Sequence, residues 1–351
     1  MIDVQDLTDL EVDERIRNLK ASMGDELFMP VHHYQRDEIV QFADYTGDSL
    51  ELSRVSAKTQ ARFIVFCGVY FMAEIARVLA SRASSEKYVF IPNRDAGCPL
   101  ADFAPLDDVE AVWGVLQDIE QGGYIPVTYA NSNADVKAFC GREGGLVCTS
   151  SNVEKIFRWI LEQGKRVFFM PDRNLGINTA ASMGMVDDYC VVRDEPDKRR
   201  GDISGKRLVI WDGFCIVHKR FTLQQVEQWR KRDPEIRIIV HPESDPEVVS
   251  ASDDAGSTSK IKRLVEESPP GSKWVIGTEY NMVQRLKGEQ PDKFIEPLVE
   301  SVCRNMSSIR RRHLLKTLLA IEAGDYSDQV VLPEDQIRDA ARAIEKMLEI
   351  S

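Results

Sequence analysis

One order of features occurs three times along this chain, and it constrains the fold more than any other property of the sequence. Each occurrence begins with a strand-like apolar run that leads into a polar cluster. A helix, a Ser-rich turn at a helix start, further strand-like runs and a loop with a cysteine follow. The similarity is one of order and chemistry rather than of residue identity. Alternating strands and helices indicate an α/β fold, and the recurrence predicts three similar units in series.

Three sets of residues mark equivalent places in this repeated order. The polar clusters occupy residues 32–34, 129–131 and 241–243, the Ser-rich turns contain Ser49, Ser150, Ser257 and Thr258, and the closing loops contain Cys98, Cys215 and Cys303. Ligands of parallel α/β units bind beyond the carboxyl ends of the strands, and free backbone N–H groups at helix starts suit phosphate or carboxylate. Units that face a common axis would therefore bring the anion-binding turns and the cysteines together.

Each Ser-rich turn, taken alone, has an ordinary explanation. A Ser or Thr at a helix start usually caps the helix, which is worth about 1 kcal/mol. The recurrence of these turns beside clusters of His, Tyr, Asn and Glu favours a binding function for all of them. The same hydroxyl can cap a helix and bind an anion.

The seven cysteines divide into two groups. Reduced thiols are expected in a cytosolic chain, and the lack of CxxC spacing argues against a zinc ribbon or a thioredoxin-type motif. Cysteines in apolar segments are expected to pack as inert small residues, and these are Cys67, Cys140, Cys190 and, although it adjoins a Ser-rich turn, Cys148. The three loop cysteines have no core role to explain them, so any metal would be held by cysteines far apart in sequence.

Four of the five histidines fall within the polar clusters or a cysteine loop. A lone histidine is more often a satisfied surface or core residue. This concentration instead favours catalysis or anion binding for His32, His218 and His241.

Composition limits the class of protein and its partners. A chain of 351 residues favours two or three domains, and its 29% charged and 43% hydrophobic content is typical of globular proteins. The net charge of −12 argues against a nucleic-acid partner. The acidic N-terminus lacks a signal-peptide core, and the longest apolar stretch contains Glu74 and Arg77. A cytoplasmic location without a membrane partner is expected.

Two further segments are informative. Residues 187–206 are highly charged and lengthen the middle occurrence of the repeat, so they are expected to form a solvated surface insertion. Residues 307–351 are expected to be helical, with Pro333 at the start of a final helix that has one apolar face. This tail is expected to lie over the first domain.

Several long motifs occur in an order that resembles one family. They are HHYQRDEIVQFADYTGDSLELSR, VTYANSNADVKA, CTSSN, GFCIVH, HPESDPEVVSASDDAGSTSKI and GTEYNMVQRLK. In this order they resemble the signature segments of bacterial quinolinate synthases, from about Met29 to Met306.

The resemblance implies a fold and a cofactor. It implies three similar three-layer α/β domains in a pseudo-threefold arrangement around a central iron–sulfur cluster. Cys98, Cys215 and Cys303, one from each domain, would hold a [4Fe–4S] cluster and leave its fourth iron open as a Lewis acid. The corresponding ranges are 1–27 for an N-terminal segment, 28–112, 113–225 (with the insertion 187–206) and 226–306 for the three domains, and 307–351 for a C-terminal helical segment.

The implied activity is that of a transferase in the de novo biosynthesis of NAD. Iminoaspartate and dihydroxyacetone phosphate would be joined to quinolinate, with loss of phosphate and water. The resemblance also implies functional contact with an L-aspartate oxidase or dehydrogenase that supplies iminoaspartate.

The resemblance extends to individual substrate-binding positions. These correspond to His32, Ser49, Tyr129, Asn131, Ser150, His241, Glu243, Ser257 and Thr258, to which the histidine pattern adds His218. Tyr34 and Glu243 are the candidates for proton transfer, with His32 assisting. Tyr129 and Asn131 would orient the condensed intermediate.

The chain departs from the family pattern at a few positions, none of them an expected ligand. The family usually has proline after its second and third cysteines, where this chain has Ile216 and Arg304, and His33 stands where Asn or Tyr is commoner. Two alternatives stay open. One is an iron–sulfur hydro-lyase-like paralogue that acts on another dicarboxylate. The other is a non-catalytic iron–sulfur sensor that would use the basic stretch 310–313 as a binding surface.

Overall fold

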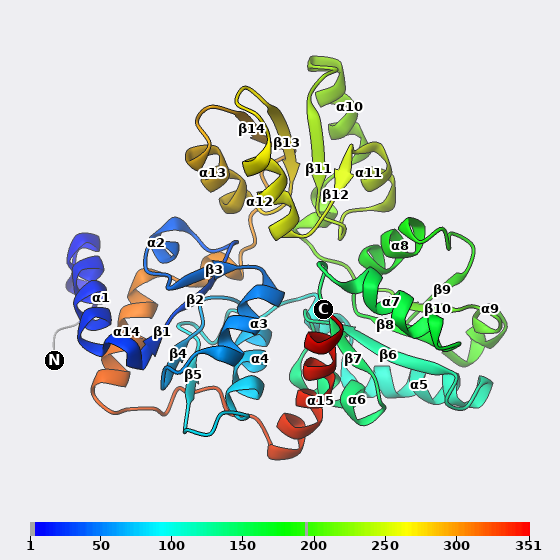
Figure 1. Ribbon diagram of the computed structural model, residues 1–351, viewed down its shortest axis with the longest axis horizontal. Helices are drawn as coiled ribbons and strands as arrows, with labels where there is room; N and C mark the ends of the chain where they lie inside the picture. Colours follow the sequence, from blue (N-terminus) through cyan, green and yellow to red (C-terminus); the bar gives the residue numbers. More distant parts are fainter. Residues whose placement is uncertain (1–3, 194–195) are drawn as a thin grey trace. The chain divides into compact units, whose positions relative to one another are not determined.

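The chain folds into parallel β-sheets and many helices, which confirms the α/β class predicted from the sequence (Figure 1). The computed structural model describes residues 4–193 and 196–351. The chain splits into a first unit of residues 1–98 and 302–337 and a second unit of residues 99–301 and 338–351. Residues 1–3 of the predicted N-terminal segment and 194–195 of the predicted insertion lie outside the described residues.

The first unit contains short strands that all pair in parallel. They are β1 (Leu27–Phe28), β2 (Pro30–His32), β3 (Tyr45–Gly47), β4 (Phe63–Val65) and β5 (Tyr88–Phe90). β1 pairs with β4, β4 with β5, and β2 with β3. Val31 of β2 also bridges to Cys67, just beyond β4. Because β1 and β2 form one nearly continuous run, the spatial order is β3, then β1 with β2, then β4 and β5.

The second unit contains two parallel sheets. The first has the order β7-β6-β8-β10-β9 and consists of β6 (Tyr124–Tyr129), β7 (Leu146–Cys148), β8 (Arg166–Met170), β9 (Tyr189–Val192) and β10 (Leu208–Trp211). The second has the order β12-β11-β13-β14 and consists of β11 (Arg237–Val240), β12 (Asp254–Ala255), β13 (Lys273–Gly277) and β14 (Phe294–Pro297).

The same strand order therefore occurs three times. In each case the second strand along the chain lies on one side of the first, and the third and fourth strands follow on its other side. β9 is the one described strand without a counterpart, at the edge of its sheet beyond β10. The domain ranges 28–112, 113–225 and 226–306 and their pseudo-threefold arrangement stay predictions.

Helices connect the strands by crossovers, which are right-handed in parallel sheets. The helices of the first unit are α1 (Asp9–Met23), α2 (Asp37–Val40), α3 (Ser49–Lys58), α4 (Tyr70–Ala80) and α14 (Arg311–Glu322). Those associated with the sheet of β6 to β10 are α5 (Leu106–Ile119), α6 (Ala134–Arg142), α7 (Val153–Glu162), α8 (Arg173–Ser182) and α9 (Arg200–Ile203). The remaining ones are α10 (Leu223–Arg232), α11 (Pro246–Ala251), α12 (Thr258–Glu267), α13 (Tyr280–Glu289) and α15 (Glu334–Ile350).

The sheet of β11 to β14 is covered on both faces. Helices α10 and α11 lie on one side of it, and α12 and α13 lie on the other (Figure 1). Its inner strands are apolar; Ile238, Val240 and Val275 are fully buried in one hydrophobic cluster. This packing fixes the carboxyl ends of the strands, from which the site residues project.

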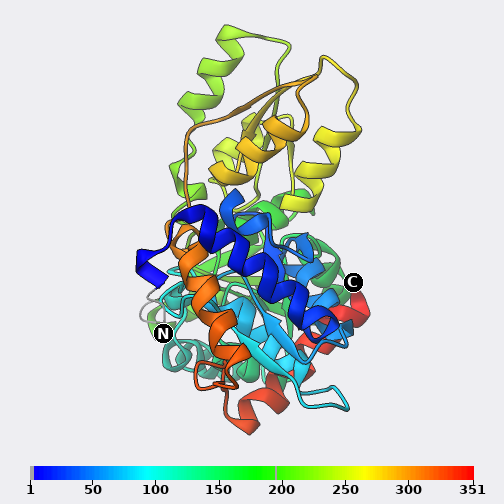
Figure 2. The same ribbon diagram turned by 90° about the vertical axis from the view of Figure 1, so that its left-hand side faces the viewer.

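Helices α1 and α14 pack side by side in the first unit (Figure 2). Arg311 of α14 lies 3.0 Å from Asp13 of α1 and 3.0 Å from Glu38 of α2. Arg312 pairs with Asp9 at 2.6 Å. The basic stretch that the sensor alternative would use as a binding surface therefore makes ion pairs within its own unit.

The C-terminal tail divides between the two units. α14 belongs to the first unit, whereas α15 belongs to the second from residue 338 onward. Lys346 of α15 donates a hydrogen bond to the carbonyl oxygen of Gly144 (2.9 Å), and Gly141 of α6 lies directly against the carbonyl of Asp339. The expectation that the tail lies over the first domain is therefore wrong for α15.

One prediction of local structure needs correction. Residues 187–206 are not a plain solvated loop, because they contribute the edge strand β9, with Cys190 and Val192 buried, and the short helix α9. β14 is short and partly polar, and it pairs in register with β13. The final helix begins directly after Pro333, as predicted. No helix among the described residues is long and apolar enough to cross a membrane.

Candidate active site

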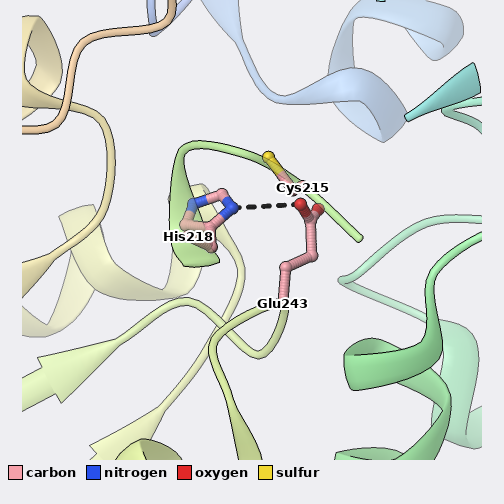
Figure 3. Close-up of side chains that lie close together, drawn as sticks. All are labelled: Cys215, His218 and Glu243. Carbon is pink, nitrogen blue, oxygen red and sulfur yellow. Dashed lines mark hydrogen bonds and ion pairs between the residues drawn. The ribbon is translucent and has the colours of Figure 1, made fainter. Parts of the chain in front are cut away.

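A buried cluster of polar side chains occupies the carboxyl ends of the strands in the second unit. Tyr129, the last residue of β6, places its hydroxyl 2.5 Å from Oε1 of Glu243, which follows β11. Nδ1 of His218 lies 3.0 Å from Oε2 of the same carboxylate (Figure 3). Nε2 of His218 in turn lies 3.4 Å from the hydroxyl of Thr278, which follows β13. These contacts form a continuous hydrogen-bonded chain.

His241 completes this cluster from the first residue after β11. Its ring stacks on that of His218, with centroids 4.4 Å apart and an angle of 17° between the planes. Its Nδ1 accepts the backbone N–H of Glu243 at 3.4 Å. Burial, and secondarily the neighbouring His218, lower the pKa of His241 to about 3. The ring is therefore neutral near pH 7, and with Nδ1 as acceptor its proton is on Nε2.

Glu243 and Tyr129 differ in protonation although both are fully buried. Burial alone would raise the pKa of Glu243, but the neighbouring His218 and the hydrogen bonds from His218 and Tyr129 lower that pKa to about 2. Burial and the charge of Glu243 raise the pKa of Tyr129 well above its usual value. The pair is thus a carboxylate that accepts a hydrogen bond from a neutral phenol.

The Ser-rich turns of the second unit lie where the sequence predicts. The Ser150 side chain makes a hydrogen bond to the Tyr129 hydroxyl and does not cap α7, whose N-cap is Asn152. Ser257 does cap α12, because its Oγ accepts the N–H of Lys260 at 3.3 Å. Thr258, the next residue, is also buried. It follows β12, which pairs with β11, the strand that precedes His241. Asn131, in the loop after β6, is half-buried.

The equivalent residues of the first unit show the same local geometry. Nδ1 of His32 accepts the backbone N–H of Tyr34 at 3.1 Å, as His241 does with Glu243. The rings of His32 and Tyr34 meet edge to face at 4.7 Å. β2 and β3 pair His32 with Gly47, so the turn with Ser49 begins beside this cluster. Ser49 is the first residue of α3, which Asp48 caps.

Exposure separates the cysteines into the two groups that the sequence predicts. Cys98, Cys215 and Cys303 are partly exposed, whereas the other four are buried. Burial raises the pKa of the Cys67 thiol to about 12 and also raises the pKa of Cys140, Cys148 and Cys190. A metal ligand must be a thiolate, so the buried thiols are poor candidates.

One of the partly exposed cysteines lies beside this buried polar cluster. The sulfur of Cys215, a ring nitrogen of His218 and a carboxylate oxygen of Glu243 all lie within 4.8 Å of one another (Figure 3). These atoms are of the types that hold a metal ion. In the first unit, the Asn93 amide donates to Ser308 (3.3 Å to its carbonyl and 3.2 Å to its hydroxyl), which links the loop before Cys98 to the segment after Cys303.

One buried carboxyl near the cluster was not expected from the sequence. Asp172 lies two residues after the end of β8 and caps α8. Its Oδ1 accepts the N–H of Leu175 at 2.7 Å, whereas its Oδ2 has no hydrogen-bond partner among the described residues. Burial, and then the charge of Glu243, raise the pKa of Asp172 well above its usual value. Its position just beyond an apolar strand-like run was the signal available in the sequence.

The structure thus gathers several of the predicted site residues within each unit, although none of the contacts given above joins Asn131, Cys98 or Cys303 to these clusters. The second unit brings together Tyr129, Ser150, Cys215, His218, His241 and Glu243. The first unit brings together His32, Tyr34 and the turn of Ser49. The roles assigned to these residues stay predictions.

Comparison with known proteins identifies the family. The family model described as "Quinolinate synthetase A protein" matches residues 14–349. The chain is 44% identical over 344 residues to the quinolinate synthase of Bacillus pumilus (strain SAFR-032), with 96% of this chain and 92% of that protein covered. It is 44% identical over 354 residues to the quinolinate synthase of Bacillus subtilis (strain 168), covering 99% and 95% of the two chains. The chain belongs to the quinolinate synthetase A protein family.

Proposed function

We propose that this chain is a quinolinate synthase, a transferase of NAD biosynthesis that joins iminoaspartate and dihydroxyacetone phosphate to quinolinate with release of phosphate and water. Membership of the family and relatives named quinolinate synthase at 42–44% identity over nearly the whole chain support this proposal. These names give no support to the hydro-lyase or sensor alternatives.

The observation that carries the proposal is the buried chain of Tyr129, Glu243, His218 and Thr278. Isomerisation and dehydration each require protons to be removed and returned at defined atoms. Glu243 is ionised and accepts hydrogen bonds at both oxygens, so a proton reaching it would pass through Tyr129 or His218. The Tyr129 hydroxyl also makes a hydrogen bond with Ser150, whose turn we propose binds an anionic group of a substrate. We assign Glu243 the role of proton acceptor on this basis.

The substrates are anions, and the turns around the cluster can bind them without a buried positive charge. Ser150 and the pair Ser257–Thr258 offer hydroxyls at helix starts. His241 offers the N–H of a neutral ring, because its Nδ1 is already an acceptor. We propose that these groups share the phosphate and carboxylates, while Tyr129 and Asn131 orient the condensed intermediate.

The first unit would contribute a second set of substrate groups. The neutral form of His32 would carry its proton on Nε2, because Nδ1 accepts the N–H of Tyr34. We propose that Tyr34 takes part in proton transfer with His32 assisting, and that the helix start at Ser49 binds an anionic group of a substrate.

The donor chemistry of the chain fits a [4Fe–4S] cluster. We propose that Cys98, Cys215 and Cys303 hold it, because these are the cysteines that are not buried. When bound, a cluster with three protein ligands supplies an open iron that acts as a Lewis acid on substrate oxygens. We also propose that an L-aspartate oxidase or dehydrogenase supplies iminoaspartate.

The activity is tested with protein purified without oxygen and given both substrates. We expect quinolinate to form only when iminoaspartate and dihydroxyacetone phosphate are both present. A protein that contains its full complement of iron and sulfide but forms no quinolinate would instead favour the paralogue that acts on another dicarboxylate.

The cluster is tested by alanine substitution of each cysteine group. Replacing Cys98, Cys215 or Cys303 is expected to abolish bound iron and sulfide, whereas replacing Cys67, Cys140 or Cys190 is expected to leave both unchanged. Equal iron content in all six variants would refute the ligand assignment. Bound iron without sulfide would point to a single ion at Cys215, His218 and Glu243.

A further inference from the structure

Helix α8 presents two buried amides to the loop that carries Glu243. Asn174 and Asn178 lie one turn apart, so their side chains leave the same face of the helix. Both residues are buried: 0% of the surface of Asn174 and 8% of that of Asn178 is exposed. Asp172 fixes the start of this helix by accepting the N–H of Leu175.

Each amide uses its NH₂ group to bind two acceptors of this loop. Asn174 donates to the carbonyl of Glu243 at 3.1 Å and to Oδ1 of Asp245 at 3.0 Å. Asn178 donates to the carbonyls of Pro242 at 2.8 Å and Ser244 at 2.9 Å. Acceptors from four consecutive residues, 242–245, are thus bound by two side chains.

These carbonyls belong to a connection between β11 and α11, so no strand or helix ladder satisfies them. A buried carbonyl without a partner costs about 1–3 kcal/mol. An amide suits the task because its two N–H donors diverge and carry no charge. A carboxylate in the same place would set oxygen against oxygen, and a hydrophobic residue would satisfy neither carbonyl.

We infer that Asn174 and Asn178 are positioning residues that hold the backbone of residues 242–245, so that the Glu243 carboxylate stays between Tyr129 and His218. The inference rests on the proposed function, because it assigns how the acid–base cluster of that function is held. Lys219, next to His218, binds both carboxylate oxygens of Asp245 at 2.7 and 2.8 Å. Helix α8 and the segment that contains His218 are thereby both bound to the loop of residues 242–245.

The test uses the full chain, purified without oxygen with its iron and sulfide. The variants are Asn174→Ala, Asn178→Ala and the isosteric Asn178→Asp, which leaves no cavity. We expect kcat at saturating substrates to fall about tenfold to hundredfold, because misplacing an acid–base group by about 1 Å has effects of this size. KM should stay within about twofold, because the anion-binding turns do not include these amides.

Thr179→Val is the matched control. Thr179 is buried on the same helix, and its hydroxyl bonds to the carbonyl of Leu175 at 2.7 Å within α8. This variant weakens the helix without removing a contact to the Glu243 loop, so its kcat should match that of the unmodified chain.

A second measurement does not depend on activity. Amide hydrogen exchange of the substrate-free protein is followed by mass spectrometry in peptides that contain residues 241–251. We expect faster exchange there in the asparagine variants than in the unmodified chain or in Thr179→Val. If the unmodified chain forms no quinolinate, the proposed function fails, while exchange still tests how the loop is held.

Three results would overturn the inference. The first is unchanged kcat and exchange in the asparagine variants. The second is an equal loss of kcat in Thr179→Val. The third is failure of every asparagine variant to fold, the isosteric one included, because these residues would then serve folding rather than positioning.

Discussion

The Glu243 carboxylate has both of its oxygens in hydrogen bonds, Oε1 with Tyr129 and Oε2 with His218. A buried charge is tolerated only when such partners are present. The pair with Tyr129 links a strand end of one sheet to the loop after β11 of another. Removing a single hydroxyl should therefore affect stability and activity together.

Tyr129→Phe tests this at the residue scale. We expect a loss of about 1–3 kcal/mol in the free energy of unfolding, because one oxygen of a buried carboxylate loses its donor. We also expect kcat to fall at least about tenfold, because the chain for proton transfer is interrupted. Thermal unfolding and quinolinate assays measure the two effects.

Tyr124→Phe is the control for this substitution. Tyr124 lies at the start of the same strand, is also buried, and its hydroxyl makes only long bonds of 3.4 Å to the Lys206 carbonyl and to Arg166. Its variant should keep kcat. Equal loss of activity in the two variants would mean that the hydroxyl of Tyr129 has no special role.

His241 makes stability depend on pH in a defined direction. Its pKa is about 3 when folded and 6.5 in its ordinary state, so between these values the unfolded chain binds a proton that the folded chain does not. Stability therefore falls as the pH is lowered from 6.5 toward 3, by up to about 1.4 kcal/mol per pH unit. In His241→Asn the thermal midpoint should fall less steeply from pH 6.5 to 4.5. Equal slopes in the two proteins would contradict a neutral, buried His241.

At the scale of elements, the packing of α15 against α6 depends on one glycine. A Cβ at Gly141 of α6 would lie 1.8 Å from the carbonyl oxygen of Asp339, closer than atoms can approach. The helices can therefore touch only because this position has no side chain. Gly114 of α5 is a helical glycine without such a neighbour, since nothing lies within 4 Å of a Cβ there.

Gly141→Ala and Gly114→Ala should consequently have opposite effects. We expect Gly141→Ala to lower the free energy of unfolding by about 1–3 kcal/mol, because α15 must shift. Gly114→Ala should raise it by about 0.5–1 kcal/mol, because alanine restricts the unfolded chain. Denaturant unfolding measures both. If Gly141→Ala were also stabilising, α15 would not pack at this site.

Sequence patterns predicted a strand well where its own residues are apolar. They predicted it less well where the strand forms only by pairing with a neighbouring strand. β8 and β10 are largely apolar runs, the pattern from which the sequence predicts a strand. β9 and β14 are short, lie at sheet edges and are flanked by polar or charged residues. They form strands only because they pair with β10 and β13. Their formation therefore depends on a neighbouring strand rather than on their own residues.

For the whole molecule, three sheets of one strand order repeat the same placement of chemistry. Polar clusters follow the first strand, helix starts follow the second, and a cysteine loop follows the fourth. In parallel sheets these ends lie at one edge, where ligands bind. If three cysteines hold an iron–sulfur cluster, the cluster binds the folded chain and not the unfolded one. Its binding must therefore increase the stability of the folded chain.

Removal of iron and sulfide should reveal this linkage. We expect the thermal midpoint of the unmodified chain to fall when the metal is chelated without oxygen, because thiolate binding to the folded state is lost. Cys67→Ala should respond in the same way, whereas Cys215→Ala should start from a lower midpoint and show no further fall. A midpoint that chelation does not change would refute a structural contribution from the cluster.

The sequence by itself determined the order of strands, polar clusters and cysteine loops along the chain and the chemistry at the strand ends. Apolar runs followed by His32, Tyr129 or His241 are local signals, because a residue directly after a buried strand is held at the sheet edge wherever that strand lies. The division of the cysteines was also local, since loop position separated the partly exposed ones from the buried ones. Motif resemblance then named the family that the comparisons show.

Only the tertiary structure decided which polar residues support the site. Asn174 and Asn178 stand on a helix with no marked pattern, and their partners are 64 to 71 residues further along the chain. Asp172 became notable through burial, which raises its pKa beside the charge of Glu243. Burial and the direction of a hydrogen bond depend on packing across sheets, so no local pattern can encode them.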